Sequence, residues 1–149
     1  MTLSDELFRL NSIFIDTAPI IYYIEAHHQF GPLSKELLEY FQDKKLSAYT
    51  SVITLTEVLV KPFETGNDNL ALKFSKFLRY SNNISLLEIT ASIAETAGRL
   101  RGKYPFLRTM DALQIAVALN ISADAFITND INLKKIDEIK TIVLKDYLP

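Results

Sequence analysis

Four carboxylate side chains stand where a predicted strand or loop passes into a helix or turn. Asp16 follows the apolar run at 12–15, Glu57 comes soon after the run at 46–52, and Asp130 follows the run at 125–128. Asp111 lies near the start of an almost wholly apolar segment, 109–119. Carboxylates that share one cleft repel one another, so their ionised forms need a cation nearby. A hard divalent cation such as Mg²⁺ or Mn²⁺ prefers oxygen ligands, and substrate phosphate oxygens often complete its shell. The pattern therefore indicates metal-dependent phosphate chemistry, provided that the four acids converge.

Each of these acids also has a purely structural interpretation. Asp16 is a good N-cap, since aspartate accepts hydrogen bonds from the first backbone amides of a helix. Thr54 and Glu57 have the spacing of a capping box, which is the better interpretation for Glu57 alone. Asp111, two residues after a possible cap at Thr109, would complement the helix dipole. The functional interpretation rests on the four acids occurring together.

The residue types that are missing or misplaced narrow the chemistry further. The sequence has no cysteine, and its two histidines, His27 and His28, are adjacent rather than spaced for one metal. A disulfide framework, a thiolate metal site and a cysteine nucleophile are therefore excluded. Water activated by a metal that oxygen atoms hold is favoured over covalent nucleophilic catalysis.

The elements that must position these acids follow from the hydrophobic pattern. Segments with helical spacing, such as 33–41, 70–78, 93–100 and 109–119, alternate with short runs rich in β-branched and other apolar residues. The predicted strands are 12–15, 46–52, 84–89, 125–128 and 141–144. Alternating strands and helices predict an α/β fold, a three-layer α/β/α sandwich with a central parallel sheet of about five strands. In such sheets ligands bind at the carboxyl ends of the strands, where the acids would lie.

Composition sets the broad class of protein. The chain has 149 residues, of which 48% are hydrophobic and 23% charged, as expected of one globular domain spanning residues 1–149. Neither a membrane-spanning run nor a signal-peptide pattern is found, so we expect a cytoplasmic protein without membrane contact.

Taken together, the motifs resemble those of the PIN domain family, particularly its small prokaryotic members, the VapC-type toxins. The resemblance covers nearly the whole chain and rests on four segments in this order: Phe14-Ile15-Asp16-Thr17, Thr56-Glu57-Val58-Leu59, Met110-Asp111-Ala112-Leu113-Gln114-Ile115-Ala116-Val117-Ala118 and Ile127-Thr128-Asn129-Asp130. The Asp-Ala-Leu-Gln-Ile-Ala helix and the Thr-Asn-Asp turn, with an opening strand-Asp-Thr, form a specific combination.

The resemblance implies a Mg²⁺- or Mn²⁺-dependent endoribonuclease with a PIN-like α/β/α fold. It also implies a homodimer and, for a toxin, an antitoxin whose tail covers the active cleft. Asp16, Asp111 and Asp130 would then bind the metal directly or through water, and Glu57 would complete the acidic set. The hydroxyls of Thr17 and Thr128 would be accessory groups that orient water or phosphate.

Basic side chains that could bind RNA phosphates occur in local clusters along the chain. The strongest candidates lead into Asp111, and they are Arg99, Arg101, Lys103 and Arg108. Sixteen basic against eighteen acidic residues give a formal charge of −2, which argues against binding by bulk positive charge. Setting aside the four clustered acids leaves fourteen against sixteen basic residues. We therefore expect modest RNA affinity that depends on the divalent ion.

Two other interpretations remain open. The chain could be a non-catalytic PIN-like module that binds RNA or protein, or a PIN nuclease that acts on DNA or on rRNA processing intermediates without an antitoxin. The large apolar residues at 33–41 and 70–78 fit the core best, and a dimer or antitoxin surface is the alternative.

Overall fold

The computed structural model describes residues 1–43 and 46–149, with the side chains of 41–43 left out, so the Phe41 side chain of the predicted helix 33–41 lies outside the described residues. The elements in chain order are α1 (Leu3–Phe8), β1 (Ser12–Ile15), α2 (Thr17–Ile24), α3 (Gly31–Asp43), β2 (Ser47–Ser51), α4 (Val52–Glu64), α5 (Asp68–Tyr80), β3 (Ser85–Leu87), α6 (Ala91–Lys103), α7 (Thr109–Asn120), β4 (Ala125–Thr128), the 3₁₀ helix η1 (Ile131–Lys135), β5 (Thr141–Val143) and the 3₁₀ helix η2 (Leu144–Tyr147). None of the helices within these ranges is long and apolar enough to cross a membrane.

The five strands form one parallel sheet in the order β3-β2-β1-β4-β5. All five predicted strands are confirmed, and β1 and β4 have the predicted bounds. The neighbouring strands β1 and β4 are buried on both faces, which explains why their sequences are mostly apolar rather than alternating. Side chains still alternate between the faces: Ile13 and Ile15 pack into one core cluster, and Phe14 packs into the other.

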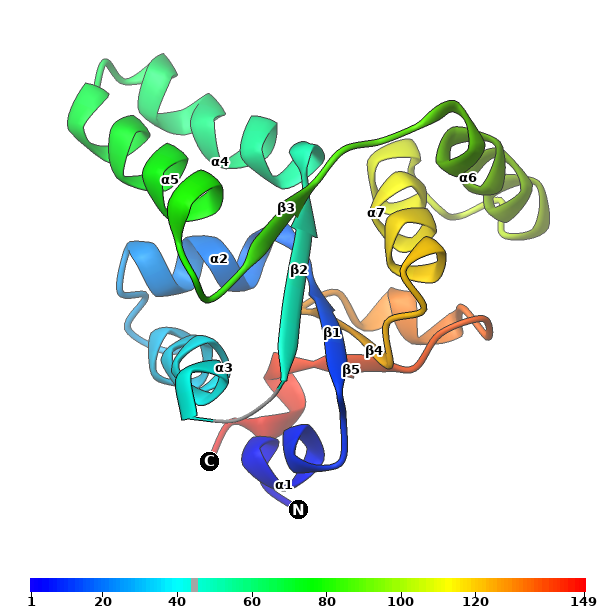
Figure 1. Cartoon of the computed structure of the whole chain (residues 1–149), viewed down its shortest axis with the longest axis horizontal. Helices are drawn as coiled ribbons and strands as arrows, with labels where there is room; N and C mark the ends of the chain where they lie inside the picture. The colour runs from blue at the N-terminus through cyan, green and yellow to red at the C-terminus, as the bar shows by residue number, and fades with distance from the viewer. Residues whose placement is uncertain (44–45) are drawn as a thin grey trace.

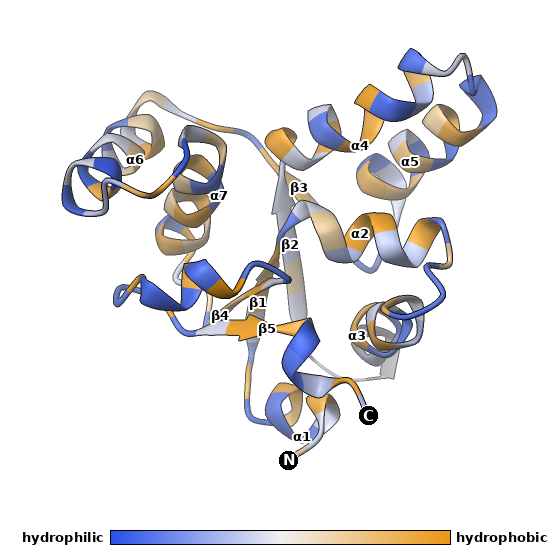
Figure 2. Cartoon of the chain, turned by 180° about the vertical axis from the view of Figure 1, so that it is seen from behind, coloured by the Kyte–Doolittle hydropathy of each residue, from blue (hydrophilic) through white to orange (hydrophobic). Residues whose placement is uncertain are grey.

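Helices cover both faces of the sheet, which confirms the three-layer α/β/α architecture (Figure 1). Helices α1 to α5 pack on the face of Ile13 and Ile15, and α6, α7 and η1 pack on the face of Phe14. Phe14 and Phe126 are paired in register on β1 and β4 and stack with ring centroids 5.4 Å apart under α7. The flanking helices mix apolar and polar segments (Figure 2), as amphipathic helices do.

Two helices begin at residues other than the expected ones. The N-cap of α4 is Ser51, whose hydroxyl accepts a hydrogen bond from the Ile53 amide, so the Thr54–Glu57 capping box is wrong. The N-cap of α7 is Arg108 rather than Thr109, and it makes no side-chain cap bond. Because α4 starts directly at the end of β2, Glu57 lies in its second turn and is not used to close the helix end.

Candidate active site

The first acid of the site is positioned by the junction of β1 and α2. Asp16 follows the last residue of β1 and is the N-cap of α2, with Oδ1 accepting from the Thr17 amide at 2.9 Å. Ile15 is in register with Ile127 of β4, so the residues that follow this pair, Asp16 and Thr128, are neighbours. Accordingly, the Thr128 hydroxyl donates to Asp16 Oδ2 at 2.8 Å. Asp16 therefore serves both as a helix cap and as part of the acidic cluster.

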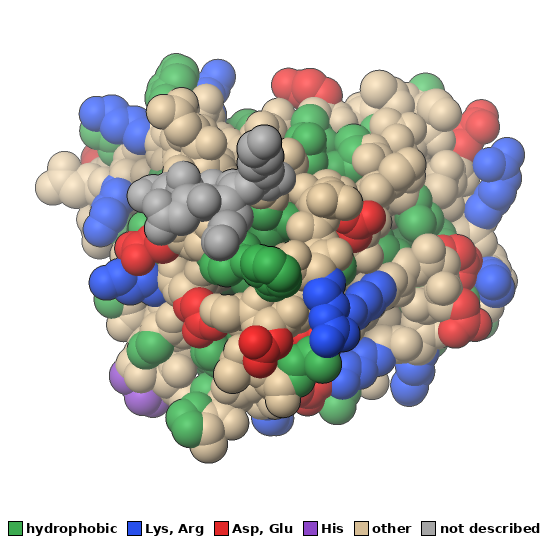
Figure 3. All heavy atoms as spheres, turned by 60° about the horizontal axis from the view of Figure 1, so that its bottom comes forward, with side chains coloured by type: hydrophobic (Ala, Val, Ile, Leu, Met, Phe, Trp, Pro, Cys, Tyr) green, Lys and Arg blue, Asp and Glu red, His purple; other side chains and the backbone are tan. Residues whose placement is uncertain are grey.

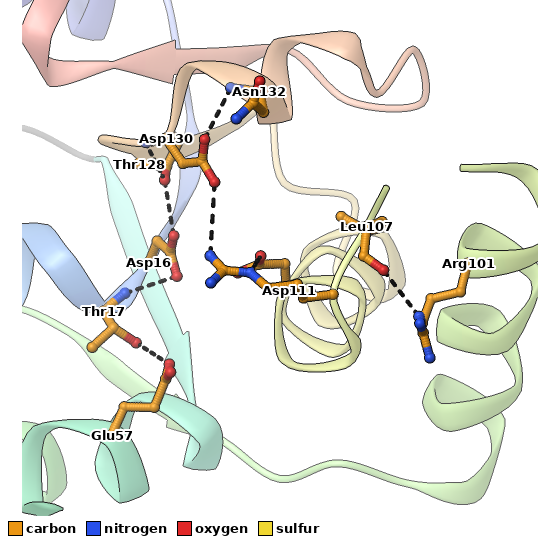
Figure 4. A network of polar contacts seen from close by, with 10 residues as sticks. Asp16, Thr17, Glu57, Arg101, Leu107, Asp111, Thr128, Asp130 and Asn132 are labelled. Atoms are coloured by element: carbon orange, nitrogen blue, oxygen red, sulfur yellow. Dashed lines mark hydrogen bonds and ion pairs between the residues drawn. The ribbon is translucent and has the colours of Figure 1, made fainter. Parts of the chain in front are cut away.

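Two further acids meet through one arginine. Asp111 is in the first turn of α7 and Asp130 lies in the turn after β4 (Figure 4). The Arg108 guanidinium contacts both carboxylates. Arg108 Nε is 3.2 Å from Asp111 Oδ2, and Nη2 is 3.9 Å from Asp130 Oδ2. Asp130 Oδ1 also accepts from the Asn132 amide at 3.0 Å, which fixes the turn into η1. The charge of Asp111 is the main reason that the pKa of Arg108 is raised.

The fourth acid reaches the site from a neighbouring helix. Glu57 is exposed on α4, and its Oε1 accepts a hydrogen bond of 2.6 Å from the Thr17 hydroxyl. The same hydroxyl is 3.2 Å from Thr54 Oγ1, so Thr17 connects Glu57 to the buried part of α4. The sticks in Figure 4 show Glu57, Thr17 and Asp16 linked by hydrogen bonds.

These residues line one open cleft at the carboxyl ends of the strands. Its volume is about 490 Å³. The lining residues include all four predicted acids, both predicted threonines and one predicted cation: Asp16, Thr17, Ala18, Ile21, Tyr22, Glu57, Arg108, Asp111, Thr128, Asn129, Asp130 and Ile131. Larger hollows occur elsewhere, for example one of about 780 Å³ between α2, α3 and α5, but the acids gather at this one.

The electrostatics of the cleft are those of crowded carboxylates. Burial raises the pKa of Asp16 from 3.8 to about 6. The hydrogen bonds from Thr17 and Thr128 lower this pKa, whereas the charges of Asp111 and Glu57 raise it further. Ionising Asp16 is therefore unfavourable in the absence of a cation, which is the behaviour expected of an acid in a metal-binding cleft.

The donor chemistry of the cleft fits a hard divalent cation. Carboxylate and hydroxyl oxygens face the cleft, and these are the ligands that Mg²⁺ and Mn²⁺ prefer. Among the described residues, no three His, Cys, Asp or Glu side chains stand close enough together to form a ready metal cage. Arg108 lies instead where it neutralises Asp111 and Asp130.

A buried polar cluster beneath the cleft was not identified from the sequence. Gln114 of α7 is only 1% exposed, accepts a short hydrogen bond from the Ser51 hydroxyl and donates to Thr54 Oγ1 at 2.7 Å. The Thr50 hydroxyl donates to the Ile15 carbonyl at 2.8 Å and lies at the same distance from Thr54 Oγ1. This cluster holds α4, α7 and β2 together under the acids. The available signal was a glutamine three residues after Asp111 in an otherwise apolar helix.

The predicted RNA-binding cations differ in their surroundings. Arg101 Nε donates to the Leu107 carbonyl and Nη1 to the Thr109 hydroxyl, both at 2.9 Å, so this side chain anchors the loop before α7 (Figure 4). Lys103 pairs with Glu138 at 3.5 Å, and Arg99 is exposed on α6. Arg108 is the one of the four that lines the cleft. Acidic and basic side chains are interspersed on the face shown in Figure 3, which matches the small net charge.

Comparisons with known proteins agree on the fold. The family model of the PIN domain matches residues 13–139. The chain is similar to VapBC2 from Rickettsia felis bound to a promoter DNA fragment, with 18% identity and a TM-score of 0.69 over 89% of this chain and 98% of that one. A toxin–antitoxin complex from Klebsiella pneumoniae has 20% identity and a TM-score of 0.66 over 89% of this chain and 97% of that one. VapC20 from Mycobacterium tuberculosis is a toxin that cleaves the sarcin–ricin loop. It has 19% identity and a TM-score of 0.63 over 76% of this chain and 86% of that one. No curated protein sequence matches significantly.

Proposed function

Because this chain belongs to the PIN domain family, we propose that it is a Mg²⁺- or Mn²⁺-dependent endoribonuclease and the toxin of a toxin–antitoxin pair. The observation that carries the proposal is the convergence of Asp16, Asp111 and Asp130 with Glu57 on one cleft at the carboxyl ends of the strands. The similarity to the sarcin–ricin-loop-cleaving VapC20 supports RNA as the substrate.

In the proposed mechanism the four acids bind the metal, and two threonines position them. Asp16, Asp111 and Asp130 would hold the metal directly or through water, and Glu57 would complete the acidic set. When bound, the ion would polarise the scissile phosphoryl group and lower the pKa of a water molecule that attacks phosphorus. Thr128 holds the Asp16 carboxylate in place, and Thr17 holds that of Glu57. In this hydrolysis the water oxygen would form the new bond to phosphorus while the bond from phosphorus to the leaving alcohol oxygen breaks. The water would lose a proton, and the leaving oxygen would take one up.

The direct test is cleavage of RNA, including a sarcin–ricin loop oligonucleotide, by the wild type and by Asp16→Asn and Asp111→Asn. Both variants should lose activity while remaining folded by circular dichroism, because each loses a charged oxygen ligand. Asp137→Asn is the matched control, since Asp137 is an exposed acid on the loop after η1. Wild-type activity in either site variant, or wild-type activity in excess EDTA, would refute the proposal.

A non-catalytic PIN-like module is distinguished by metal uptake. A cation that binds only the folded state stabilises it by RT ln(1 + [L]/Kd), about 2.7 kcal/mol at a hundredfold excess over Kd. The proposed nuclease should gain melting temperature with Mn²⁺, and Asp16→Asn should not. Parallel cleavage of single-stranded DNA separates the RNA-specific enzyme from a nuclease that acts on DNA.

An antitoxin and a homodimer are further parts of the proposal. The similar structures from R. felis and K. pneumoniae are toxin–antitoxin complexes, which supports a cognate partner here. The apolar residues expected in the core, such as Leu37 and Phe74, are buried, whereas Val60, Phe63 and Leu72 are exposed on the paired helices α4 and α5. This exposed set is the surface that a second subunit or an antitoxin would cover.

Growth after induced expression in a bacterial host tests the toxin assignment. The wild type should arrest growth and Asp16→Asn should not. Normal growth with the wild type would remove the toxin assignment and leave the nuclease assignment to the cleavage assay.

Sedimentation of the purified chain reports its oligomeric state, and Phe63→Glu should favour the monomer.

A further inference from the structure

Arg108 has an unusual combination of exposure and contacts. Its side chain is 79% exposed, yet the guanidinium contacts two acids that are 19% and 34% exposed, Asp111 and Asp130. Its Nε and Nη2 reach separate carboxylates, at 3.2 and 3.9 Å. The stem therefore extends through solvent while the charged end rests at the mouth of the cleft.

Helix capping does not account for an arginine at this position. Arg108 is the N-cap of α7 and makes no side-chain cap bond. The five other N-caps given for the described α-helices carry capping side chains, namely Thr2, Asp16, Ser51, Asn67 and Thr90. A cation at a helix N-terminus also opposes the helix dipole. What holds the Arg108 side chain in place is thus its contact with the two acids.

The other partners of the acids in the described chain are uncharged donors. Asp16 accepts from the Thr17 amide and the Thr128 hydroxyl, Glu57 accepts from the Thr17 hydroxyl, and Asp130 also accepts from the Asn132 amide. Arg108 is the one cation in the described chain within 4 Å of any of these four acids. It supplies the positive charge that crowded carboxylates need.

We propose that Arg108 has two alternating roles: in the metal-free protein it is the counter-ion of Asp111 and Asp130, and in the metal-bound protein it binds an RNA phosphate. A divalent cation held by the same two carboxylates repels the guanidinium and replaces it as their counter-ion. Because the Arg108 stem is exposed, the released side chain is free to turn without disturbing the core. The second role rests on the proposed ribonuclease function.

The chemistry of arginine suits both roles. Its planar fork of donors reaches two carboxylates in the metal-free state, which the single ammonium of lysine does less well. The same fork binds phosphate oxygens in pairs. RNA binding by Arg108 is therefore coupled to metal binding, because the acids compete with the phosphate for the guanidinium until a metal takes its place.

Metal binding without RNA tests the first role. In calorimetric titrations with Mn²⁺, Arg108→Gln should bind about two- to fivefold more tightly than the wild type, the range expected for releasing exposed ion pairs. Arg99→Gln removes the same charge from an exposed site on α6 and should leave the affinity near that of the wild type. In parallel, the NMR resonance of the Arg108 Nε–H should move as Mg²⁺ is added and should stop moving when Mg²⁺ saturates the protein.

The coupling is tested with a short fluorescent single-stranded RNA, with Ca²⁺ as the cation or with EDTA. Arg108→Gln should weaken RNA binding about tenfold with Ca²⁺, the size of one charge-assisted contact, and hardly at all in EDTA. Arg99→Gln should change the RNA affinity by the same factor with Ca²⁺ and in EDTA. Equal effects of Arg108→Gln with and without Ca²⁺ overturn the coupling, and equal Mn²⁺ affinities of Arg108→Gln and the wild type overturn the counter-ion role. Absence of Mn²⁺ binding in both proteins instead overturns the proposed function, and this inference with it.

Discussion

Replacing Asp16 with asparagine should stabilise the metal-free protein, although it removes a proposed metal ligand. The Asp16 carboxyl is half-buried, and burial raises its pKa from 3.8 to about 6 despite the hydrogen bonds from Thr17 and Thr128. Ionisation of this group therefore opposes folding when no cation is present. Asparagine has a similar shape and no charge, so Asp16→Asn removes this unfavourable ionisation.

The sign and size of the effect follow from the two pKa values. In the unfolded chain Asp16 loses its proton near pH 3.8, whereas in the folded chain it keeps the proton until about pH 6. Between these values the unfolded state binds fewer protons, so the free energy of unfolding falls as the pH rises. A difference of roughly two pKa units corresponds to about 3 kcal/mol. The stability of Asp16→Asn relative to the wild type should therefore grow by up to about 3 kcal/mol between pH 4 and 7 and then level off.

The pH dependence isolates Asp16 from the other consequences of the substitution. Hydrogen bonds that asparagine fails to make add an offset to the free energy of unfolding that does not vary with pH. The test therefore uses only how the difference in stability between Asp16→Asn and the wild type changes with pH. Urea unfolding in EDTA at several pH values from 4 to 8 gives this difference. In thermal unfolding it corresponds to a relative gain of about 6–12 °C for a protein of this size.

Asp137→Asn is again the matched control, and its stability relative to the wild type should stay flat over the same pH range. A constant difference between Asp16→Asn and the wild type from pH 4 to 8, or one that shrinks as the pH rises, would refute the reasoning. Adding Mn²⁺ should reverse the order of stability, since the wild type gains binding energy and the variant does not.

Two other substitutions test parts of the structure that support the site, and a third tests a buried hydroxyl on α3. Thr128→Val removes a hydrogen bond that lowers the pKa of Asp16, so the fall in stability should continue to a higher pH and become larger in the same urea assay, and a fall that ends where that of the wild type ends would contradict this. Gln114→Ala leaves the Ser51 and Thr54 hydroxyls with fewer partners in a buried site and should lower the free energy of unfolding by about 2–4 kcal/mol, whereas a loss under about 1 kcal/mol would argue against a structural role for the cluster. Ser34→Ala removes a fully buried hydroxyl with no hydrogen-bond partner in the described part of the chain, so stability should stay the same or rise by up to about 1 kcal/mol, and a clear loss in urea would show that the hydroxyl has a partner.

Most of the fold could be predicted because its signals are local. The runs at 12–15 and 125–128 are short, apolar and bounded by polar turns, and they form β1 and β4 with the same bounds. A strand that ends one or two residues before an aspartate places that aspartate near the carboxyl edge of a parallel sheet. For this reason the positions of Asp16 and Asp130 were accessible from the chain alone.

Helix starts were less predictable, since several residues near each start are able to cap. Ser51, Thr54 and Thr56 are all hydroxyl residues close to the end of β2. Ser51 is the N-cap because the helix begins as soon as the strand ends, and this brings Thr54 into the buried cluster and Glu57 to the Thr17 hydroxyl. Sequence spacing alone favours a capping box of Thr54 and Glu57, whereas the structure uses Ser51 as the N-cap of α4.

By itself the sequence determined the type of fold, its five strands and a set of candidate acids, since hydrophobic periodicity and turn residues act over short stretches of chain. Only the tertiary structure decided which strands are neighbours and which side chains meet. Thr128 donates to Asp16 across 112 positions because β1 and β4 pair in register, and Gln114 meets Ser51 across 63 because α7 packs against β2. The two roles inferred for Arg108 likewise depend on Asp130 arriving from a distant strand. Contacts of this kind depend on the packing of the whole sheet, which no local pattern encodes.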